Sequence, residues 1–334
     1  MPLPKSLIVR GIAALVFVYV LGVLALMWWW DYEPPHFDVT ANAREVVADT
    51  TSTTRVVTGS TTTAALITSA QTLLDKRGGY LSNDKFPPGV LMDNVPNWEF
   101  GVLTASRDLA RALRNDFSRS QTQSVEDKDL QEADPLFSSP NDRWLLPSSE
   151  SQYAKAIAHT RGYLARLGDA DDGNAQFYAR ADNLADYLQI VSTRLGSLSQ
   201  KLSAAAGQVR LDTTLAGDPN AQQATPTPSA KLMRTPWTQI DDNFYEARGY
   251  TWALREQLEA IRIDFATILA SKNATVSLEQ IIRELEESQK SLGSPIVLNG
   301  RPFGFFANHS LVMANYISRA NAAIIDLREL LKRG

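Results

Sequence analysis

The sequence predicts an all-α protein: a single N-terminal transmembrane helix followed by an elongated helical-bundle ectodomain with a long antiparallel helical hairpin. Two observations predict this class. One apolar run near the N-terminus carries no charge, and two later stretches repeat apolar residues at alternating steps of four and three. The overall composition, 44% hydrophobic and 21% charged, is that of a folded chain rather than a disordered one.

The apolar run covers residues 11–30 and reads GIAALVFVYVLGVLALMWWW. At about 1.5 Å per residue, a helix of this length crosses the roughly 30 Å hydrocarbon core of a bilayer. A cleaved signal peptide is the competing interpretation. However, the run exceeds a typical signal-peptide core, and no small-residue cleavage site precedes the tryptophans. We therefore expect an uncleaved signal anchor over residues 11–30.

The residues that flank this run predict its direction. Lys5 and Arg10 precede it, whereas Asp31 and Glu33 follow it. Because cytoplasmic flanks are enriched in Lys and Arg, residues 1–10 form a predicted cytoplasmic stub, and the bulk of the chain lies on the other side. Four aromatic residues at the outer end are predicted to seat the anchor at headgroup level: Trp28, Trp29, Trp30 and Tyr32.

Beyond the anchor, the sequence predicts an extended linker over residues 31–60. Two prolines stand near the start of this segment, and a Thr- and Ser-rich stretch lies at its end. Residues 61–334 then form the predicted helical domain. Two polar, proline-containing segments within it, at about 120–149 and 206–235, are predicted to be internal linkers.

Apolar spacing predicts several helices in this domain. Three of them precede the hairpin, at residues 61–77, 96–118 and 150–167. Two follow it. One covers residues 277–291 and opens with a capping box of Ser277 and Gln280, and the other is capped by Asn308 and runs to about residue 331.

The predicted hairpin consists of two helices with heptad spacing, at residues 177–205 and 240–268. Each would be about 40 Å long at the helical rise. Alanine, threonine and phenylalanine interrupt the larger aliphatic residues of these seams. This mixture favours two seams that face each other within one chain, and packing between chains is the alternative.

The chain offers few groups for catalysis or metal binding. It has no cysteine, and its three histidines lie in separate segments without the spacing of a metal motif. No phosphate-binding, dinucleotide-binding or serine-nucleophile motif occurs. We therefore expect no metal site and no cofactor. The net charge of −4 gives no electrostatic footprint for nucleic acid, so nucleic acid is not an expected partner.

Glu99 is the candidate catalytic residue. It stands between Trp98 and Phe100, and an apolar environment raises the pKa of a carboxyl group toward that of a general acid. The alternative interpretation is a glutamate near the start of a helix, beside a packed tryptophan.

The stretch GGYLSNDKFPPGVLMDNVPNWEFGVL, residues 78–103, and the motif PPxFD at residues 34–38 resemble a proteobacterial family catalogued only as domain of unknown function 2333. The resemblance covers most of the chain. It implies a bacterial inner-membrane protein with its bulk in the periplasm, and it implies no activity. Six residues in or beside this loop are predicted to form a binding or assembly surface: Tyr80, Asn83, Asp84, Asp93, Asn94 and Trp98.

Together these features favour a non-enzymatic, membrane-anchored periplasmic scaffold or a subunit of a cell-envelope complex. Its expected partners are the lipid bilayer and either further copies of itself or other envelope proteins. One alternative is a glycan or peptidoglycan hydrolase that uses Glu99. Another is a periplasmic ligand-binding bundle that serves a membrane partner, and this would require a cavity between the two seams.

Overall fold

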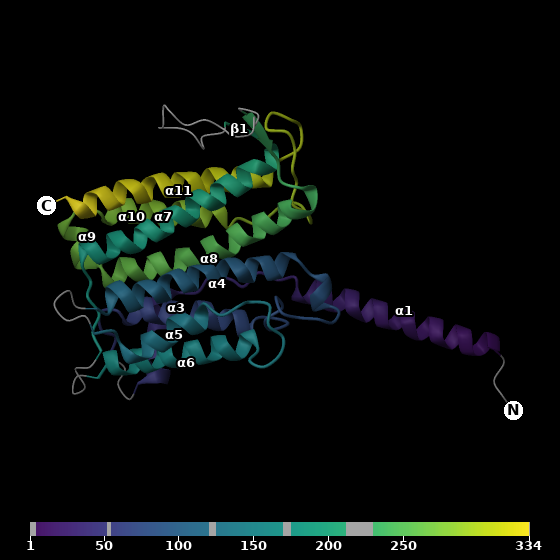
Figure 1. The fold of residues 1–334 in the computed structure, drawn as a ribbon, viewed down its shortest axis with the longest axis horizontal. Coiled ribbons are helices and arrows are strands. Elements are labelled where there is room, and N and C mark those ends of the chain that lie inside the picture. Colours follow the sequence, from purple (N-terminus) through teal and green to yellow (C-terminus); the bar gives the residue numbers. More distant parts are fainter. Residues whose placement is uncertain (1–4, 52–54, 120–124, 170–174, 212–229, 334) are drawn as a thin grey trace, which may run out of the picture.

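The computed structural model describes residues 5–51, 55–119, 125–169, 175–211 and 230–333. Figure 1 shows a long helical bundle from one end of which a single helix projects. The described residues form eleven α-helices: α1 (Lys5–Trp30), α2 (Val39–Thr50), α3 (Ser60–Asp75), α4 (Asn94–Ala112), α5 (Lys128–Phe137), α6 (Ser149–Leu167), α7 (Ala181–Ser203), α8 (Ile240–Asp264), α9 (Ala266–Ser271), α10 (Thr275–Ser288) and α11 (His309–Lys332).

Two short strands, β1 (Gln208–Leu211) and β2 (Ala230–Met233), pair antiparallel between α7 and α8. A π-helical turn, Leu113–Phe117, continues α4, and 3₁₀ turns occur at Gly89–Leu91, Ala204–Ala206 and Trp237–Gln239. The all-α class is therefore confirmed, with one small ribbon added to it.

The apolar N-terminal helix is present and stands apart from the bundle. Its membrane-length stretch, Ser6–Trp30, is long and apolar enough to cross a bilayer, and none of its most apolar window is buried. A helix of this kind near the N-terminus is a membrane span or a signal sequence.

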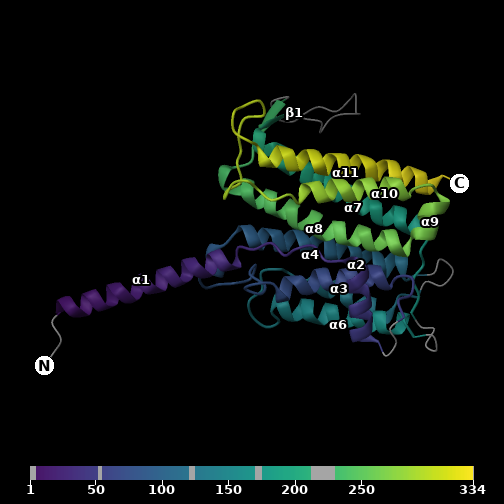
Figure 2. The same cartoon turned by 180° about the vertical axis from the view of Figure 1, so that it is seen from behind.

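Helices α4 and α8 form the centre of the bundle. On one side of this pair lie α2, α3, α5 and α6, and on the other lie α7, α10 and α11, as both views show (Figures 1 and 2). The core runs continuously through both halves, because buried residues from ten of the described helices, α2 to α11, belong to one hydrophobic cluster.

The heptad seams are buried within the single chain, but they do not chiefly face each other. Helix α7 packs mainly against α11, and α8 packs mainly against α4. On α7 the buried seam includes Leu188, Val191 and Leu195, and on α8 it includes Leu254 and Leu258. A seam shows only that one face of a helix is apolar. Helices α11 and α4 also carry apolar faces, so α7 packs on α11 and α8 on α4 more than on each other.

Two of the predicted linkers contain helices. Residues 39–50, within the segment predicted to be extended, form α2, which Asp38 caps by accepting a hydrogen bond from the Ala41 amide at 2.9 Å. Residues 128–137, within the second predicted linker, form α5. Both helices are short, so their apolar spacing covers too few turns to stand out from neighbouring polar sequence. The third predicted linker is described only at its two ends, where β1 and β2 pair, and residues 212–229 lie outside the described part.

Of the predicted caps of the last two helices, one is confirmed and one is wrong. Asn308 caps α11 as predicted, because its side chain accepts a hydrogen bond from the Leu311 amide at 2.9 Å. The capping box at Ser277 is wrong, since α10 begins at Thr275 and Ser277 therefore lies within its first turn.

Two glycines allow α4 and α8 to cross in close contact. A Cβ atom on Gly101 of α4 would lie 2.1 Å from the Glu246 carbonyl oxygen of α8. A Cβ atom on Gly249 of α8 would lie 2.0 Å from the Trp98 carbonyl oxygen of α4. Both obstacles are backbone atoms, which a side-chain rotation cannot clear. The crossing therefore depends on glycine at both positions.

Gly249→Ala should lower the stability of the bundle even though alanine is the better helix former. Overpacking against the backbone costs about 1–3 kcal/mol, which exceeds the gain of roughly 0.5–1 kcal/mol from helix propensity. Thermal denaturation followed by circular dichroism measures the change. Gly196→Ala on α7 is the matched control, because its Cβ would meet only the Asn321 side chain at 3.7 Å. Equal melting temperatures for the two variants would contradict the close crossing.

Candidate functional site

Glu99 stands on α4, and its buried side chain lies on the interior side of the loop that connects α3 to α4. Its carboxylate accepts hydrogen bonds from the Leu81 amide at 2.9 Å and the Ser82 amide at 2.8 Å. The Lys76 ammonium stands 2.6 Å from the same carboxylate. The exposed fraction of the side chain is 0% for Glu99 and 2% for Lys76. This is a closed cluster in which one buried acid on α4 holds the first part of the α3–α4 loop.

The closed cluster leaves Glu99 without an open path to a substrate. Burial raises the pKa of the Glu99 carboxyl, while the nearby Lys76 ammonium acts in the opposite direction. A general acid must reach the leaving group at hydrogen-bond distance, and both Glu99 oxygens are already used inside the protein. The geometry therefore favours the structural interpretation of Glu99 and weighs against the hydrolase hypothesis.

The six predicted loop residues divide into an internal and an external set. Three of them are buried. The Tyr80 hydroxyl donates to the Asn141 carbonyl at 3.1 Å, and the Asn83 amide donates to the Arg143 carbonyl at 2.8 Å. Trp98 packs against Trp252 with ring centroids 5.2 Å apart. These residues join the loop to its neighbours, and Trp98 also borders a cavity.

The other three residues, Asp84, Asp93 and Asn94, reach the surface at least in part. Asp93 is the N-cap of α4 and accepts a hydrogen bond from the Asn94 amide at 2.9 Å. Burial, followed by the nearby Glu150 carboxylate, raises the pKa of Asp84. The external half of the predicted surface is therefore small and acidic.

The predicted aromatic anchor residues also divide into two groups. The Arg77 guanidinium lies over the rings of Trp29, at 4.2 Å, and Tyr32, at 4.0 Å. Gly78 lies against the Trp30 ring, because a Cβ atom there would come within 2.7 Å of it. Trp28, by contrast, is 80% exposed. The end of α1 therefore docks on the bundle through Trp29 and Trp30, and Tyr32, just after the helix, docks beside them.

Arg248 of α8 ties the segment just after α1 to the centre of the bundle. Although it is buried, its guanidinium donates to both carboxylate oxygens of Glu33 at 2.7 Å. It also donates to the carbonyls of Gln289 and Lys290, each at 2.9 Å, and these carbonyls lie just beyond the last turn of α10. A cation at this position donates hydrogen bonds to carbonyls that lack helical partners. It also interacts favourably with the negative end of the helix dipole.

A second set of contacts holds the chain just after Glu33. His36 Nδ1 lies 2.5 Å from Glu256 Oε1, and the His36 ring stacks over Trp252 with centroids 6.0 Å apart. Phe37 meets the same tryptophan edge-on, at 6.1 Å between centroids. Glu256 is fully buried and also pairs with Arg255 at 3.0 Å. The segment just after α1 is therefore bound to the bundle. Residues 31–38 carry no helix, and the helical part of the predicted linker begins only at Val39.

Sequence reasoning missed Arg248, Glu256 and Trp252. Each stands on a helix whose apolar seam was recognised, yet none belongs to that seam. A buried arginine and an exposed one look alike in a sequence. The only available signal was the pair Glu33 and Arg248, two opposite charges more than two hundred residues apart, and nothing in the sequence places them together.

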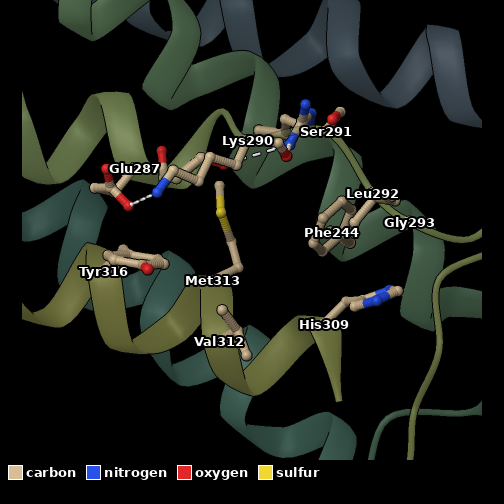
Figure 3. Close-up of a pocket in the computed structure, with 12 residues that line it drawn as sticks. Phe244, Glu287, Lys290, Ser291, Leu292, Gly293, His309, Val312, Met313 and Tyr316 are labelled. Carbon is tan, nitrogen blue, oxygen red and sulfur yellow. Dashed lines mark hydrogen bonds and ion pairs between the residues drawn. The ribbon is translucent and has the colours of Figure 1, made fainter. Parts of the chain in front are cut away.

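Two cavities adjoin Arg248. One, of about 300 Å³, is bordered by the residues that follow α1 and by Trp98 and Tyr245. The other, of about 170 Å³, lies between α8, α10 and α11. Figure 3 shows Val312, Met313 and Tyr316 of α11 on one side of it and the Glu287–Lys290 ion pair across from them.

A third cavity, also of about 170 Å³, lies between α4, α7 and α8 and is lined by Arg194, Lys201, Glu246 and Tyr250. This is the position at which a ligand-binding bundle was expected to be hollow. Pockets for small ligands usually enclose about 300–1,000 Å³, and of these three cavities among the described residues, the one beside the end of α1 reaches the lower end of that range. Among the residues that the structure describes, no group of three or more His, Asp or Glu side chains is arranged to hold a metal ion.

The comparisons with known proteins agree with the resemblance. A family model described as "Uncharacterized protein conserved in bacteria (DUF2333)" matches residues 4–334. No curated protein and no solved structure matches the chain.

Lys76→Met should destabilise the fold strongly. An unpaired buried carboxylate costs about 3–5 kcal/mol, and adding Glu99→Gln to the variant should recover a large part of that loss. Denaturant unfolding of the wild type, both single variants and the double variant measures the coupling. A Glu99→Gln protein with wild-type stability that loses its cellular function would contradict the structural role and revive the catalytic one.

Asp116, in the π-helical turn after α4, should make stability depend on pH. Burial, followed by the nearby Asp186 carboxylate, raises the pKa of Asp116 to about 6 from 3.8. Because the folded chain holds this proton more tightly than the unfolded chain does, ionisation destabilises the fold as pH rises from 3.8 to about 6. Asp116→Asn should therefore raise the melting temperature at neutral pH and have little effect in acid below pH 3.8. Asp49→Asn, at an exposed position on α2, is the control, and an equal gain at both pH values would contradict this account.

Proposed function

We propose that this chain, which belongs to the DUF2333 family of bacterial proteins, is a non-enzymatic scaffold or subunit of a cell-envelope complex. In this proposal α1 is an uncleaved anchor in the inner membrane. Lys5 and Arg10 keep its N-terminus in the cytoplasm, and the helical bundle lies in the periplasm.

The observation that carries the proposal is the fixed connection between α1 and the bundle. Glu33 follows the last residue of α1 by only three positions and is held by the buried Arg248. Arg77 holds Trp29, within α1, and Tyr32, the residue before Glu33. An enzyme or binding domain that works alone needs only a flexible tether. A rigid connection between α1 and the bundle, here called the mount, gives the bundle one orientation on the membrane. A structural subunit requires such an orientation.

A fixed orientation also supports assembly in the membrane plane. Every copy presents the same helix faces to its neighbours, so contacts between copies, or with other envelope proteins, form without the entropy cost of ordering a flexible tether. We therefore include self-association or association with another envelope protein in the proposal.

One observation favours a second candidate function, a ligand-binding bundle that serves a membrane partner. The cavity of about 300 Å³ lies directly beside the outer end of α1 and is lined by Tyr32, Trp98, Tyr245 and Arg248. A ligand there would contact the anchor segment and the bundle at once. Burial raises the pKa of Tyr245 to about 12, so its hydroxyl stays protonated and can donate a hydrogen bond.

The scaffold proposal is tested by the mass of the native particle. The full chain is extracted from its own membrane into lipid nanodiscs or mild detergent, its particle mass is measured, and its neighbours are identified after cross-linking. We expect a particle heavier than one chain of 36.9 kDa with its lipid. A lone monomer without cross-linked neighbours would remove the scaffold proposal and leave the ligand-binding candidate.

Glu33→Gln should loosen the mount without unfolding the bundle. Because the chain has no native cysteine, spin labels can be placed at Val18→Cys on α1 and Thr193→Cys on α7. Pulsed electron paramagnetic resonance in nanodiscs measures the distribution of distances between the two labels. The distribution should be narrow in the otherwise unchanged chain and broad in the Glu33→Gln variant. Glu45→Gln, at an exposed position on α2, is the matched control. Equally narrow distributions in all three proteins would show that the ion pair does not fix the mount.

A further inference from the structure

Three loops carry exposed apolar side chains at the end of the bundle from which α1 leaves. They connect α3 to α4, α5 to α6, and α10 to α11, and Figures 1 and 2 show this end from opposite sides. We call six of these side chains the apolar tips: Phe86, Leu91, Trp144, Leu146, Phe303 and Phe305. Phe303 and Phe305 are almost completely exposed, as is Leu146, with an exposed fraction of 97%.

Direct contacts join all three loops to the exit of α1. The first loop begins at the Gly78 contact with Trp30. It holds the second loop through Asn83, and through Phe86 and Trp144, whose ring centroids lie 5.7 Å apart. The third loop begins at the Lys290 carbonyl, which Arg248 holds together with Glu33. The position of the apolar tips relative to the anchor is therefore set by the fold.

The phenylalanine-rich tip is held in an ordered turn. The Gly300 amide donates to the Ala307 carbonyl at 2.9 Å, and the His309 amide donates to the Leu298 carbonyl at 2.9 Å. The Asn308 side chain also donates to the Gly300 carbonyl at 2.7 Å. These bonds close the base of the loop, so Phe303 and Phe305 project from it as a consequence of its fold.

The anchor places this end of the bundle at the membrane surface. Trp30 ends α1, and Glu33 is already fixed to the bundle. Three residues of extended chain span at most about 11 Å. When the tryptophans sit at headgroup level, Glu33 and the part of the bundle that holds it therefore lie within roughly that distance of the headgroups.

We infer that the apolar tips insert into the headgroup region of the leaflet from which α1 emerges. Tryptophan favours this region because its ring is amphipathic, and phenylalanine and leucine side chains leave water for the boundary between headgroups and acyl chains. The exposed cations Lys85 and Arg301, which neighbour the tips, are placed to meet lipid phosphates. The proposed occupant of this surface is a lipid bilayer rather than a second copy. The three loops are joined to the exit of α1, and this is where the bilayer lies if α1 spans it. The inference rests on the proposed anchoring of α1.

Depth measurements on single cysteines test the inference. The full chain, in nanodiscs that hold one copy each, carries an environment-sensitive fluorophore at Phe305→Cys, and lipids with a nitroxide at a shallow or a deep position serve as the quenchers. Val18→Cys, on α1, is the positive control for insertion. Val276→Cys is the negative control. Val276 is highly exposed and lies in the first turn of α10, directly after α9, which Figure 1 shows at the opposite end of the bundle from α1.

We expect quenching at residue 305 to be several-fold stronger than at residue 276. Quenching at residue 18 together with none at residue 305 would overturn the inference and leave the anchoring intact. No quenching at residue 18 would instead remove the anchoring and the inference with it. A signal at residue 305 that arises only in discs with two copies would overturn the inference in favour of a contact between copies.

A second variant tests whether the aromatic rings themselves cause insertion. Phe303→Ser combined with Phe306→Ser should weaken the quenching at residue 305 several-fold, while quenching at residue 18 stays unchanged. Both side chains are exposed, so the bundle should fold normally. Ile325→Ser, an exposed apolar position on α11 away from the loops, is the matched control. Undiminished quenching in the double variant would show that the rings do not hold the loop in the lipid.

Discussion

The buried guanidinium of Arg248 is the group on which the arrangement of the protein depends. It joins the residue that follows the anchor, Glu33, to the centre of the bundle and to the chain just after α10. Its neighbour Gly249 lets α4 approach α8 closely. One turn of α8 therefore fixes both the crossing of the two central helices and the direction in which α1 leaves the bundle.

The charged groups in the interior act as structural connections. A buried charge is stable only when hydrogen bonds and an opposite charge compensate for its lost hydration. Arg248 meets this condition with one carboxylate and several carbonyls, and Glu99 meets it with Lys76 and two backbone amides. Because each group is fully engaged, neither is available for proton transfer to a substrate. The same contacts explain why Arg248 and Glu99 each join separate segments of the chain.

The proposed scaffold role and the proposed lipid contact have a common origin in the mount. A flexible tether would leave the bundle free to turn, and exposed aromatic loops would then face water in most orientations. Since Glu33, Trp30 and Tyr32 are all held by the bundle, the loops that carry Phe303 and Trp144 keep one relation to α1. Membrane contact at several points would stiffen the mount further and leave the helix faces of the bundle free for other proteins.

The sequence by itself determined the helical class, the apolar helix and its charged flanks, and the Asn308 cap, because each follows from residues close together in the chain. Only the tertiary structure decided which helix each seam meets, that the segment after α1 is bound to the bundle, and that Glu99 is closed off by Lys76. Those outcomes depend on partners far apart in sequence. Periodicity shows which face of a helix is apolar, whereas the choice among several apolar faces is made by shape, at contacts such as Gly101 and Gly249.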